Sequence, residues 1–441
     1  MNKTRYAVCG LSTRGIEQYV LPLLGKSTAG SPDFSDRAEL VGVVDPDAIR
    51  VRTFCEKLGV RLPHYAVTDL PRMLAEQHPD TLLVVGPDGT HCQQIVAGLK
   101  GGCDVIAEKP MVISSQEARQ VRAAERETGR RVRVAFNFRY APASLQMKRM
   151  ILQGKVGAIT SVEFTYNCDT WHGSSYFYRW NSRRAMSGGL NISKGVHHFD
   201  LINWLLADVP EEVFAFGALN YYGKNGALRP RDTQGRPLDP VREKLRCPIF
   251  QKWYAGKVPP ESNDIRTGWD RFDLPYGTLY PPAERRYIYD DAIDVEDTYS
   301  AVVRYRRGAS MSYSCNFCSP WEGYILAING TAGRLEIVHH ADPASGKREP
   351  PSGGQITFFP LFGGKEVTTI PPVTGGHGGA DAAIQRDLFV TPSEETQSLA
   401  LIAGSEAGAL AVAVGEAVAR SIQEHRSIRI DALLQEQGKL G

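Results

Sequence analysis

Four short apolar runs, separated by stretches with helical periodicity, occupy the first third of this chain. The runs are TRYAVCG at 4–10, AELVGVVD at 38–45, TLLVV at 81–85 and CDVIAEKP at 103–110. Strands of this length that alternate with helices form βαβ units, in which the strands are parallel and the crossovers are right-handed. The sequence therefore predicts an α/β fold that begins with a parallel sheet and its covering helices.

The residues at the carboxyl ends of these strands predict a nucleotide site, because ligands of parallel α/β sheets bind at that edge. Residues 10–15 read G-x-S-x-x-G, which is the dinucleotide fingerprint with Ser12 in place of its middle glycine. This turn opens a helix, and the amino end of a helix favours phosphate. The expected cofactor contacts are Gly10, Ser12, Thr13, Arg14, Gly15, Asp45, Gly86, Pro87, His91, Glu108 and Lys109.

Asp45, which ends the second strand, favours NAD over NADP as the cofactor. A carboxylate at this point accepts hydrogen bonds from the ribose hydroxyls of NAD and repels a 2′-phosphate. Arg50 and Arg52 lie close by in the sequence and could reach such a phosphate, so NADP stays open as the alternative. A solvated turn in Asp-Pro-Asp is the structural interpretation of Asp45.

The composition limits the partners of the chain. Its 441 residues carry 51 Lys plus Arg against 49 Asp plus Glu, and the formal net charge of +2 gives no broad basic field for nucleic acid or an anionic membrane. The first strand follows too soon for a secretion signal, and no run approaches the ~20 apolar residues of a membrane span. We expect a cytoplasmic protein with a small-molecule substrate, and two domains because single cores rarely exceed ~250–300 residues.

A second group of candidate residues lies in SGGLNISKGVHHFDLINWLL at 187–206. The apolar residues of this segment recur at helical spacing after two glycines. On one continuous helix Ser193 and His197 share a face, as do Lys194 and His198. A single buried histidine is more often structural, but two adjacent histidines beside a lysine indicate a function for at least one of them.

Together these motifs resemble those of the Gfo/Idh/MocA family of oxidoreductases over nearly the full length of the chain. The resemblance depends on the glycine turn, PDGTHCQQIVAGLKGGCDVIAEKP, FNFRYAP, the GG and KGVHHFDLINWL segment, and VEDTYSAVVRYRRGASMSYS followed by NGTAGRLEI. The double histidine is similar to that of a bacterial subgroup. The resemblance implies a Rossmann NAD-binding domain at 1–135 and a substrate-binding α/β domain at 136–441, with a large, open, mainly antiparallel sheet and a C-terminal helix.

The resemblance also implies reversible hydride transfer between NAD(H) and a secondary hydroxyl or ketone of a sugar, glycoside or cyclitol. Lys109 matches the lysine of the family's EKP motif and would polarise the reacting oxygen. His197 matches the histidine of the family's D-x-G-x-H signature and would act as acid and base. Ser193 stands where that signature has its aspartate, so a proton-handling carboxylate is absent, and Lys194 adds a cation beside the site.

Two alternatives to a dehydrogenase stay open at this point. Some relatives in the wider family hydrolyse glycosides by transient oxidation of one ring carbon with retained NAD, and this mechanism needs the same lysine and histidine. The departures at Ser12 and Ser193 also suit a dinucleotide-binding protein that has lost its chemistry.

The substrate is expected to contact residues 136–180, where aromatic and planar polar side chains are crowded. Sugar rings stack on aromatic side chains and form hydrogen bonds with planar polar groups, although the same composition suits a sheet surface or a subunit contact. Further along, GGHGGAD would leave a histidine on an exposed turn, or serve as a loop before the last helix. The expected substrate contacts are Asn137, Arg139, His172, Tyr176, Arg179, Lys194, His198 and His377.

No metal site is predicted. Cys315 and Cys318 lie three residues apart on an expected strand and would point to opposite faces, as would the acidic residues of DDAIDVED. Residues 221–293 are rich in Pro, Gly, Tyr and charge and show little periodicity, which suits a cover over the site or a contact with a neighbouring subunit. The sheet that the resemblance implies often forms an oligomer interface, so a homodimer or homotetramer is expected.

Overall fold

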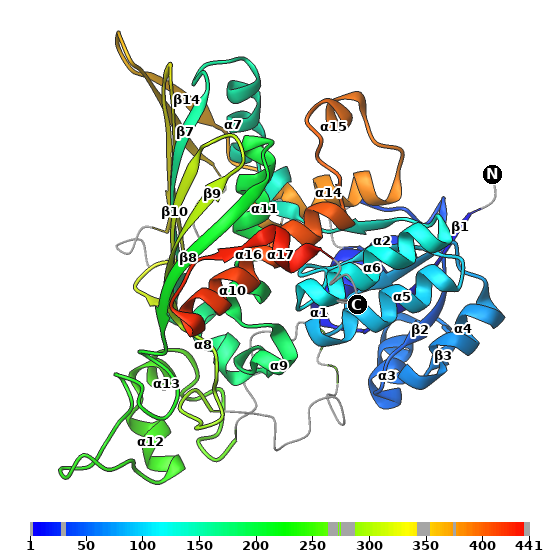
Figure 1. Ribbon diagram of the computed structural model, residues 1–441. Coiled ribbons are helices and arrows are strands. Elements are labelled where there is room, and N and C mark those ends of the chain that lie inside the picture. The colour runs from blue at the N-terminus through cyan, green and yellow to red at the C-terminus, as the bar shows by residue number, and fades with distance from the viewer. Residues whose placement is uncertain are drawn as a thin grey trace, which may run out of the picture.

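Two sheets, with helices between them, make up the computed structural model, which describes residues 3–27, 32–262, 272, 274, 287–341, 353–373 and 376–435. Figure 1 shows the first sheet and its helices in blue and cyan on the right, and the second sheet nearly edge-on at the left. Within the described residues, none of the helices combines the length and the apolar character that a membrane crossing requires.

The first sheet has the strand order of a Rossmann fold, and it confirms the predicted parallel sheet. From one edge to the other the order is β15-β6-β5-β4-β1-β2-β3, and all neighbours are parallel except β15 and β6. The strands are β1 (Thr4–Cys9), β2 (Ala38–Val44), β3 (His64–Tyr65), β4 (Thr81–Val84), β5 (Asp104–Ala107), β6 (Val132–Val134) and β15 (Ala403–Gly404). The expected division into domains 1–135 and 136–441 stays a proposal. It would assign β15, a strand of the first sheet, to the second domain.

Helices follow the strands of the first sheet as the βαβ pattern requires. Asp47 and Ser114 cap two of them, each accepting a hydrogen bond from the backbone N–H three residues later. The helices are α1 (Thr13–Gly15), η1 (Ile16–Val20), α2 (Leu21–Leu24), α3 (Ala48–Leu58), η2 (Val67–Asp69), α4 (Leu70–Gln77), η3 (Asp88–Thr90), α5 (His91–Lys100) and α6 (Ser115–Thr128).

The second sheet is mainly antiparallel, as expected. Its order is β14-β13-β12-β11-β7-β10-β9-β8-β16, and β7 and β10 form its parallel pair. Along β10 the buried residues alternate with exposed or half-buried ones, because successive side chains point to opposite faces of a sheet. The strands are β7 (Ile159–Asp169), β8 (Pro210–Ala218), β9 (Thr298–Tyr305), β10 (Ser310–Ser319), β11 (Gly323–Gly330), β12 (Gly333–His340), β13 (Gly354–Pro360), β14 (Glu366–Ile370) and β16 (Ile428–Arg429).

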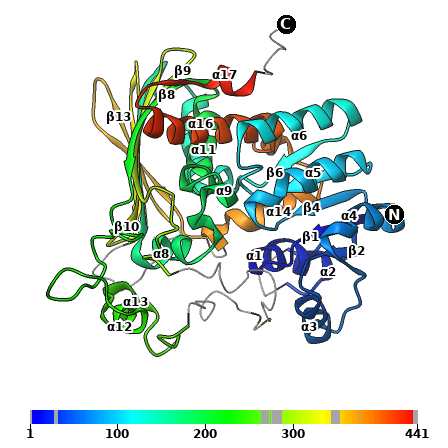
Figure 2. The same ribbon diagram turned by 60° about the horizontal axis from the view of Figure 1, so that its bottom comes forward.

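The helices of the second half lie mostly between the two sheets. Figure 2 shows α14, in orange, between the two halves of the molecule. The helices are η4 (Asn137–Tyr140), α7 (Pro142–Leu152), α8 (Thr170–Tyr178), η5 (Trp180–Ser182), α9 (Arg184–Ser187), α10 (Leu190–Ser193), α11 (Val196–Leu206), α12 (Pro240–Arg246), α13 (Pro248–Trp253), η8 (Gly376–Gly379), α14 (Ala380–Phe389), α15 (Glu394–Ser398), α16 (Ser405–Glu424) and α17 (Ile430–Leu434).

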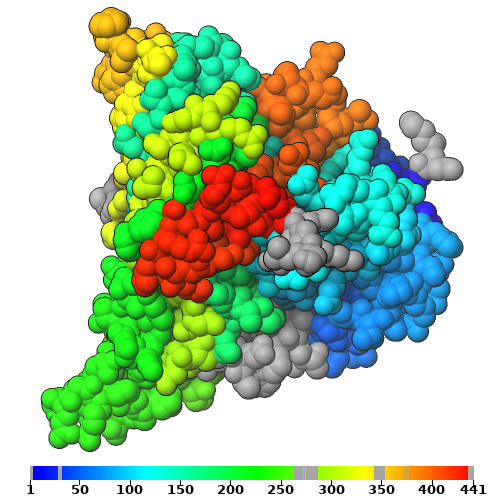
Figure 3. Space-filling view, in the orientation of Figure 1, coloured from blue at the N-terminus to red at the C-terminus, as the bar shows by residue number. Residues whose placement is uncertain are grey.

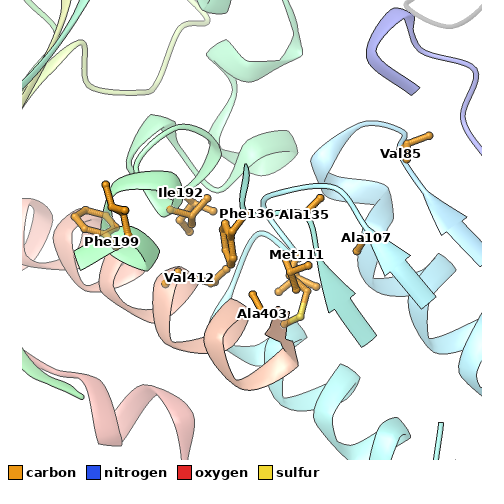
Figure 4. Packing of buried hydrophobic residues seen from close by; sticks show 14 of the residues in the cluster. Val85, Ala107, Met111, Ala135, Phe136, Ile192, Phe199, Ala403 and Val412 are labelled. Atoms are coloured by element: carbon orange, nitrogen blue, oxygen red, sulfur yellow. The ribbon is translucent and has the colours of Figure 1, made fainter. Parts of the chain in front are cut away.

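The Ala- and Gly-rich helix α16 joins the two halves. It packs against β8, α10 and α11 on the side of the second sheet and against α6 and β6 on the side of the first. Its small buried side chains allow these elements to approach closely. Figure 4 shows Val412 of α16 near Phe136 and Ile192, with Met111 and Ala403 beside them, so residues from both halves share one buried core.

The region 221–293, expected to be irregular, contains the two helices α12 and α13 in its described part. Its aromatic residues supply the packing that the sequence pattern did not reveal, since Tyr222, Tyr254 and Tyr289 are buried. Figure 3 shows α12 and α13, in green, projecting at the lower left of the molecule. The idea that this region covers the site or contacts a neighbouring subunit stays a prediction.

Gly173→Ala is expected to destabilise the protein, because α8 touches β10 at this residue. A Cβ atom at Gly173 would lie 1.7 Å from the carbonyl oxygen of Phe317. Overpacking of this kind lowers the free energy of unfolding by about 1–3 kcal/mol, which urea denaturation can measure. Gly364→Ala is the control, because a Cβ there meets no atom within 4 Å. Equal denaturation midpoints for the two variants would contradict the expected contact.

Candidate active site

The glycine turn after β1 is held by contacts within the first domain. Ser12 caps α1, since its hydroxyl accepts a hydrogen bond from the backbone N–H of Gly15 over 3.0 Å. The same hydroxyl donates to the carbonyl oxygen of Val85 over 3.1 Å, which connects the turn to the end of β4. The serine in the middle glycine position therefore has a local structural role, and a phosphate contact from it stays a prediction.

Asp45 braces the same turn from the end of β2. One carboxylate oxygen accepts a hydrogen bond from the N–H of Leu11 over 2.7 Å, and the other accepts one from the N–H of Asp47 over 2.8 Å. The side chain is buried, and burial raises its pKa. Arg50 is buried as well, and its Nε donates to the carbonyl oxygen of Leu11 over 2.7 Å. The contact of Asp45 with a ribose stays a prediction.

Arg14 and Glu108, both expected to contact the cofactor, pair with each other. Their Nε and Oε1 atoms are 2.7 Å apart, and the hydroxyl of Tyr19 donates to the same oxygen over 2.9 Å. Burial raises the pKa of Glu108, but the charges of Arg14 and Lys109 outweigh it and the pKa is lowered. Arg14 also lies 3.2 Å from the carboxylate of Asp381 in α14. This network fastens the glycine turn to the second half of the chain.

His91 is buried between two backbone carbonyl groups, and its expected contact with the cofactor stays a prediction. Its side chain is inaccessible to solvent. Nδ1 lies 2.8 Å from the carbonyl oxygen of Pro110, and Nε2 lies 2.9 Å from that of Gly86. The imidazole thus joins the end of β4 to the loop after β5, which carries Lys109 and the cis peptide bond before Pro110.

Lys109 reaches from the end of β5 to the histidine segment. Its Nζ donates to the carbonyl oxygen of Ser193, the last residue of α10, over 3.2 Å. Burial lowers the pKa of Lys109 to about 8, while the carboxylates of Asp88 and Glu108 raise it. The hydroxyl of Ser193 accepts a hydrogen bond from Nδ2 of Asn181 over 3.0 Å. The lysine of the first domain and the serine of the second therefore meet at one point.

The histidine segment consists of two helices, which corrects the expected single helix. The helix α10 ends at Ser193, and α11 begins at Val196 after Lys194 and Gly195. His197 lies in the first turn of α11 and is largely buried. Its imidazole stacks on the ring of Phe138, with the ring centres 4.6 Å apart and the planes 21° apart.

His198 lies inside an aromatic cluster, and its expected contact with substrate stays a prediction. It is fully buried, and its Nδ1 lies 2.6 Å from the hydroxyl oxygen of Tyr313. Its ring centre lies 4.2 Å from that of Tyr166. Burial, together with the nearby charges of Lys194 and Lys109, holds the pKa of His198 well below its usual value.

Lys194 belongs to a hydrogen-bonded chain on the second sheet. Its Nζ donates to the hydroxyl of Tyr166 over 3.0 Å, and this hydroxyl donates to Oε1 of Glu322 over 2.6 Å. Nδ1 of His172 lies 2.9 Å from the same oxygen. Burial raises the pKa of Glu322, but His172, Lys194 and Tyr166 lower it to about 2. The carboxylate is therefore ionised and balances the charge of Lys194 within this hydrogen-bonded chain.

Tyr176 of α8 and Arg179, which directly follows this helix, lie next to His172 of the same hydrogen-bonded chain. The ring of Tyr176 stacks on His172, with the ring centres 5.3 Å apart. The guanidinium carbon of Arg179 lies 5.5 Å from the ring centre of Tyr176, and its Nε donates to the carbonyl oxygen of Ser175 over 3.0 Å. Burial lowers the pKa of His172. The structure thus brings three of the expected substrate residues together, and their contact with a substrate stays a prediction.

Arg139 and Asn137 have partners within the protein, and their expected contact with substrate stays a prediction. Arg139 forms a buried bidentate ion pair with Asp200, at 2.7 and 2.5 Å. A guanidinium matched to a carboxylate in this way has few donors left for a ligand. Asn137 is buried, and its Nδ2 donates to Asp381 over 2.8 Å. The side chain of His377 lies outside the described residues.

Cys168, His172 and Glu322 each bring one potential metal ligand within 4.8 Å of the others, although the sequence predicted no metal. Two members of this group, His172 and Glu322, are already joined by a hydrogen bond. The oxygens of Glu322 accept from Tyr166, from His172 and from the backbone N–H of Asp169, and the ammonium of Lys194 supplies the positive charge nearby. We therefore treat the group as a hydrogen-bonded network.

Several residues that line this region carry no recognisable signal in the sequence motifs. Asp88 directly follows Gly86 and Pro87 at the end of β4, so its position at the ligand-binding edge could have revealed it. No sequence motif singled out Glu322 and Tyr166, because they come together only through the pairing of β11 with β7. Phe138 and Asn181 were likewise indistinguishable from core or loop residues in the sequence.

Two family models match the chain. The NAD-binding Rossmann domain of the Gfo/Idh/MocA oxidoreductases matches residues 4–136, and the C-terminal alpha/beta domain of the same family matches residues 148–430. The chain belongs to the Gfo/Idh/MocA family. It is accordingly an NAD-binding oxidoreductase, as the sequence motifs predicted.

The relatives of this family member include proteins named for sugar chemistry. The Bacillus subtilis oxidoreductase YteT is 39% identical over 97% of this chain and 98% of its own length. The D-glucoside 3-dehydrogenase of Escherichia coli is 27% identical over 38% of this chain and 46% of its own length. A structure of levoglucosan dehydrogenase with NADH and levoglucosan has the same fold, with a TM-score of 0.64 and 15% identity over 97% of this chain and 100% of that one.

Glu322→Gln is expected to flatten the loss of stability at acid pH. The folded pKa of Glu322, about 2, lies below its ordinary value of 4.5, so its ionised form stabilises the fold fully above pH 4.5. This contribution, on the order of 3 kcal/mol, is lost as the pH falls from 4.5 toward 2. Urea denaturation between pH 2 and 6 measures it. The exposed Glu366→Gln is the control, and a Glu322→Gln profile as steep as that of the control would contradict the burial of an ionised carboxylate.

Proposed function

We propose that this protein is a dehydrogenase that reversibly oxidises a secondary hydroxyl of a sugar, glycoside or cyclitol, with NAD as the cofactor. The contact of Lys109 with Ser193 carries the proposal, because it brings the amine at the rim of the Rossmann sheet to the segment that holds His197. The likeness to D-glucoside 3-dehydrogenase and to levoglucosan dehydrogenase supports a sugar-like substrate.

The close approach of two strand ends supports a dinucleotide site. Gly10 has a φ of +95°, and a Cβ atom there would lie 2.7 Å from Cα of Gly86. A glycine that allows a tight turn between β1 and the following helix is what the dinucleotide fingerprint requires. Asp45 supports NAD rather than NADP, because a carboxylate at the end of β2 disfavours the 2′-phosphate of NADP.

The chemistry follows from the residues of the site. Bound NAD⁺ supplies the hydride acceptor. Lys109, which its contact with Ser193 orients, donates a hydrogen bond to the substrate oxygen and polarises it. His197 takes the hydroxyl proton while the C–H bond breaks and the C=O bond forms, and it returns the proton in the reverse direction. The stacked ring of Phe138 fixes the imidazole plane during this exchange.

The outer face of the second sheet supports a homodimer or homotetramer. Helices cover the inner face, whereas apolar side chains from 37% to 65% exposed lie on several strands of the open sheet. Exposed apolar residues gathered on one surface are typical of subunit interfaces. These residues are Phe214, Phe216, Val302, Ile325, Val338, Phe359 and Val367.

The eight free cysteines fit the proposed cytoplasmic location, where thiols stay reduced.

The oligomeric state can be checked directly. Light scattering on the purified protein is expected to give the mass of a dimer or tetramer. Phe216→Lys, at an outward position of β8 that is 65% exposed, is expected to shift the mass toward the monomer, because a buried unpaired ammonium is costly. A monomeric wild-type protein would exclude this assembly.

Replacement of Lys109 by Ala is expected to lower kcat/KM by about 10³-fold or more, and His197→Ala by about 10²–10⁴-fold, because each removes a group that acts on the reacting oxygen. Absorbance of reduced nicotinamide, with a panel of sugars, glycosides and inositols, measures the activity. Both variants should still bind NAD, which quenching of protein fluorescence can test. Full activity of Lys109→Ala would refute the proposal, and release of sugar from a chromogenic glycoside without net NADH would favour the glycosidase.

A further inference from the structure

Three neighbouring strands of the second sheet place ring side chains in one row on its inner face. Tyr324 of β11 lies directly opposite Tyr166 of β7 on one side and directly opposite His339 of β12 on the other. Opposite residues of neighbouring strands point to the same face of a sheet. Tyr166 is buried on the inner face, where it meets Lys194, so Tyr324 and His339 point to that face as well.

The Tyr166 end of this row adjoins the residues of the proposed reaction. The ammonium nitrogen of Lys194 lies 4.5 Å from the ring centre of Tyr166 and 5.9 Å from that of Phe138. Phe138 in turn stacks on His197, with the ring centres 4.6 Å apart. The row therefore starts beside the proposed acid and base and leads away from it across the sheet.

Tyr324 and His339 are the accessible members of the row. Both are half-buried, whereas Leu326 and Ile337, the next opposite pair on the same face, are buried. The rings of Tyr324 and His339 lie 5.2 Å apart, from centre to centre. Among the described residues, none forms a hydrogen bond with the hydroxyl of Tyr324 or with a ring nitrogen of His339. These polar atoms are therefore available to a ligand.

The far end of the row has space beside it on β13. Gly354 begins this strand, and a Cβ atom there would lie 3.9 Å from Nδ1 of His339, with no other atom of the described residues within 4 Å. The glycine therefore leaves the edge of the imidazole uncovered. Neighbouring strands lie about 4.8 Å apart, so the row from Tyr166 to His339 spans roughly 10 Å of the sheet. This span exceeds the width of one sugar ring.

We propose that the substrate is a glycoside of at least two sugar rings, and that the ring next to the oxidised one binds to a subsite formed by Tyr324 and His339. The inference rests on the proposed function for the oxidised ring, which lies at Lys109 and His197. Ring side chains contact the C–H faces of sugars, and a phenol hydroxyl and a neutral imidazole form hydrogen bonds with sugar hydroxyls. Burial and the neighbouring His340 lower the pKa of His339, so its imidazole is neutral at pH 7.

The first test compares matched substrates. The probe is a panel of disaccharides of common hexoses, deoxyhexoses, pentoses and uronic acids, each paired with the methyl glycoside of its non-reducing sugar. Cellobiose with methyl β-glucoside and lactose with methyl β-galactoside are two such pairs. Calorimetry on the full-length protein with NAD⁺ measures affinity, and absorbance of NADH measures kcat/KM. At least one disaccharide is expected to exceed its methyl glycoside about tenfold or more in both. A panel in which no disaccharide exceeds its partner would overturn the inference.

The second test changes the subsite. His339→Ala is expected to lower the preference, which is the ratio of the two kcat/KM values, by about 3- to 10-fold through a higher KM for the disaccharide, because one ring is lost from the row. Gly354→Leu should act in the same direction, since its side chain would fill the space beside His339. Thermal unfolding checks that both variants are folded. An unchanged ratio in folded His339→Ala would refute the subsite.

His340→Ala is the matched control. His340 directly follows His339, but it points to the opposite face of the sheet, and its ring stacks on Trp321 with the ring centres 4.4 Å apart. This variant should leave the preference unchanged. An equal fall in His339→Ala and His340→Ala would show a general effect on the strand and contradict the subsite.

The failure of this inference is distinct from the failure of the proposed function. If no sugar reduces NAD⁺, but a disaccharide binds more tightly than its methyl glycoside and His339→Ala removes the difference, the dehydrogenase proposal falls and the subsite stands. If methyl glycosides are oxidised as efficiently as disaccharides, the subsite falls alone.

Discussion

The hydrogen bond from the ammonium of Lys109 to the carbonyl oxygen of Ser193 is the contact on which the site depends. One partner lies just beyond the end of β5 in the Rossmann sheet, and the other ends the helix α10, which packs against α16. Neither domain alone could hold this geometry. The helix α16 packs against elements of both halves, and β15 pairs with β6. These two contacts hold the two halves together.

Most of the buried charged side chains near this contact have a partner of opposite charge. Arg14 faces Glu108 and Asp381, Arg139 faces Asp200, and Lys194 faces the network of Glu322. Paired charges of this kind tolerate burial, whereas isolated ones shift their pKa toward the neutral form. Lys109 and Asp88 are the groups whose balance is incomplete, with pKa values of about 8 and about 6. Perturbed groups of this sort are typical of functional sites.

The sequence was informative where local chemistry decides the structure. The βαβ periodicity predicted the first sheet, and the motifs predicted the family and the open second sheet. The positions of Lys109 and Ser193 were visible in the motifs, but not their contact. The buried protein partners of His91, His198 and Arg139 were not visible either, because a polar residue in a motif does not reveal whether its partner is a ligand or a buried neighbour. Asp88 and Glu322 depend on contacts between distant segments, which no local pattern encodes.

The central claim is that a lysine of the first domain and a histidine of the second act on one carbinol beside the nicotinamide. A crystal structure with NAD⁺ and an inert substrate analogue measures this most directly. The account predicts that the carbinol carbon lies about 3–3.5 Å from nicotinamide C4, with its oxygen within hydrogen-bonding distance of both Lys109 and His197. A nicotinamide ring bound away from both side chains would contradict it.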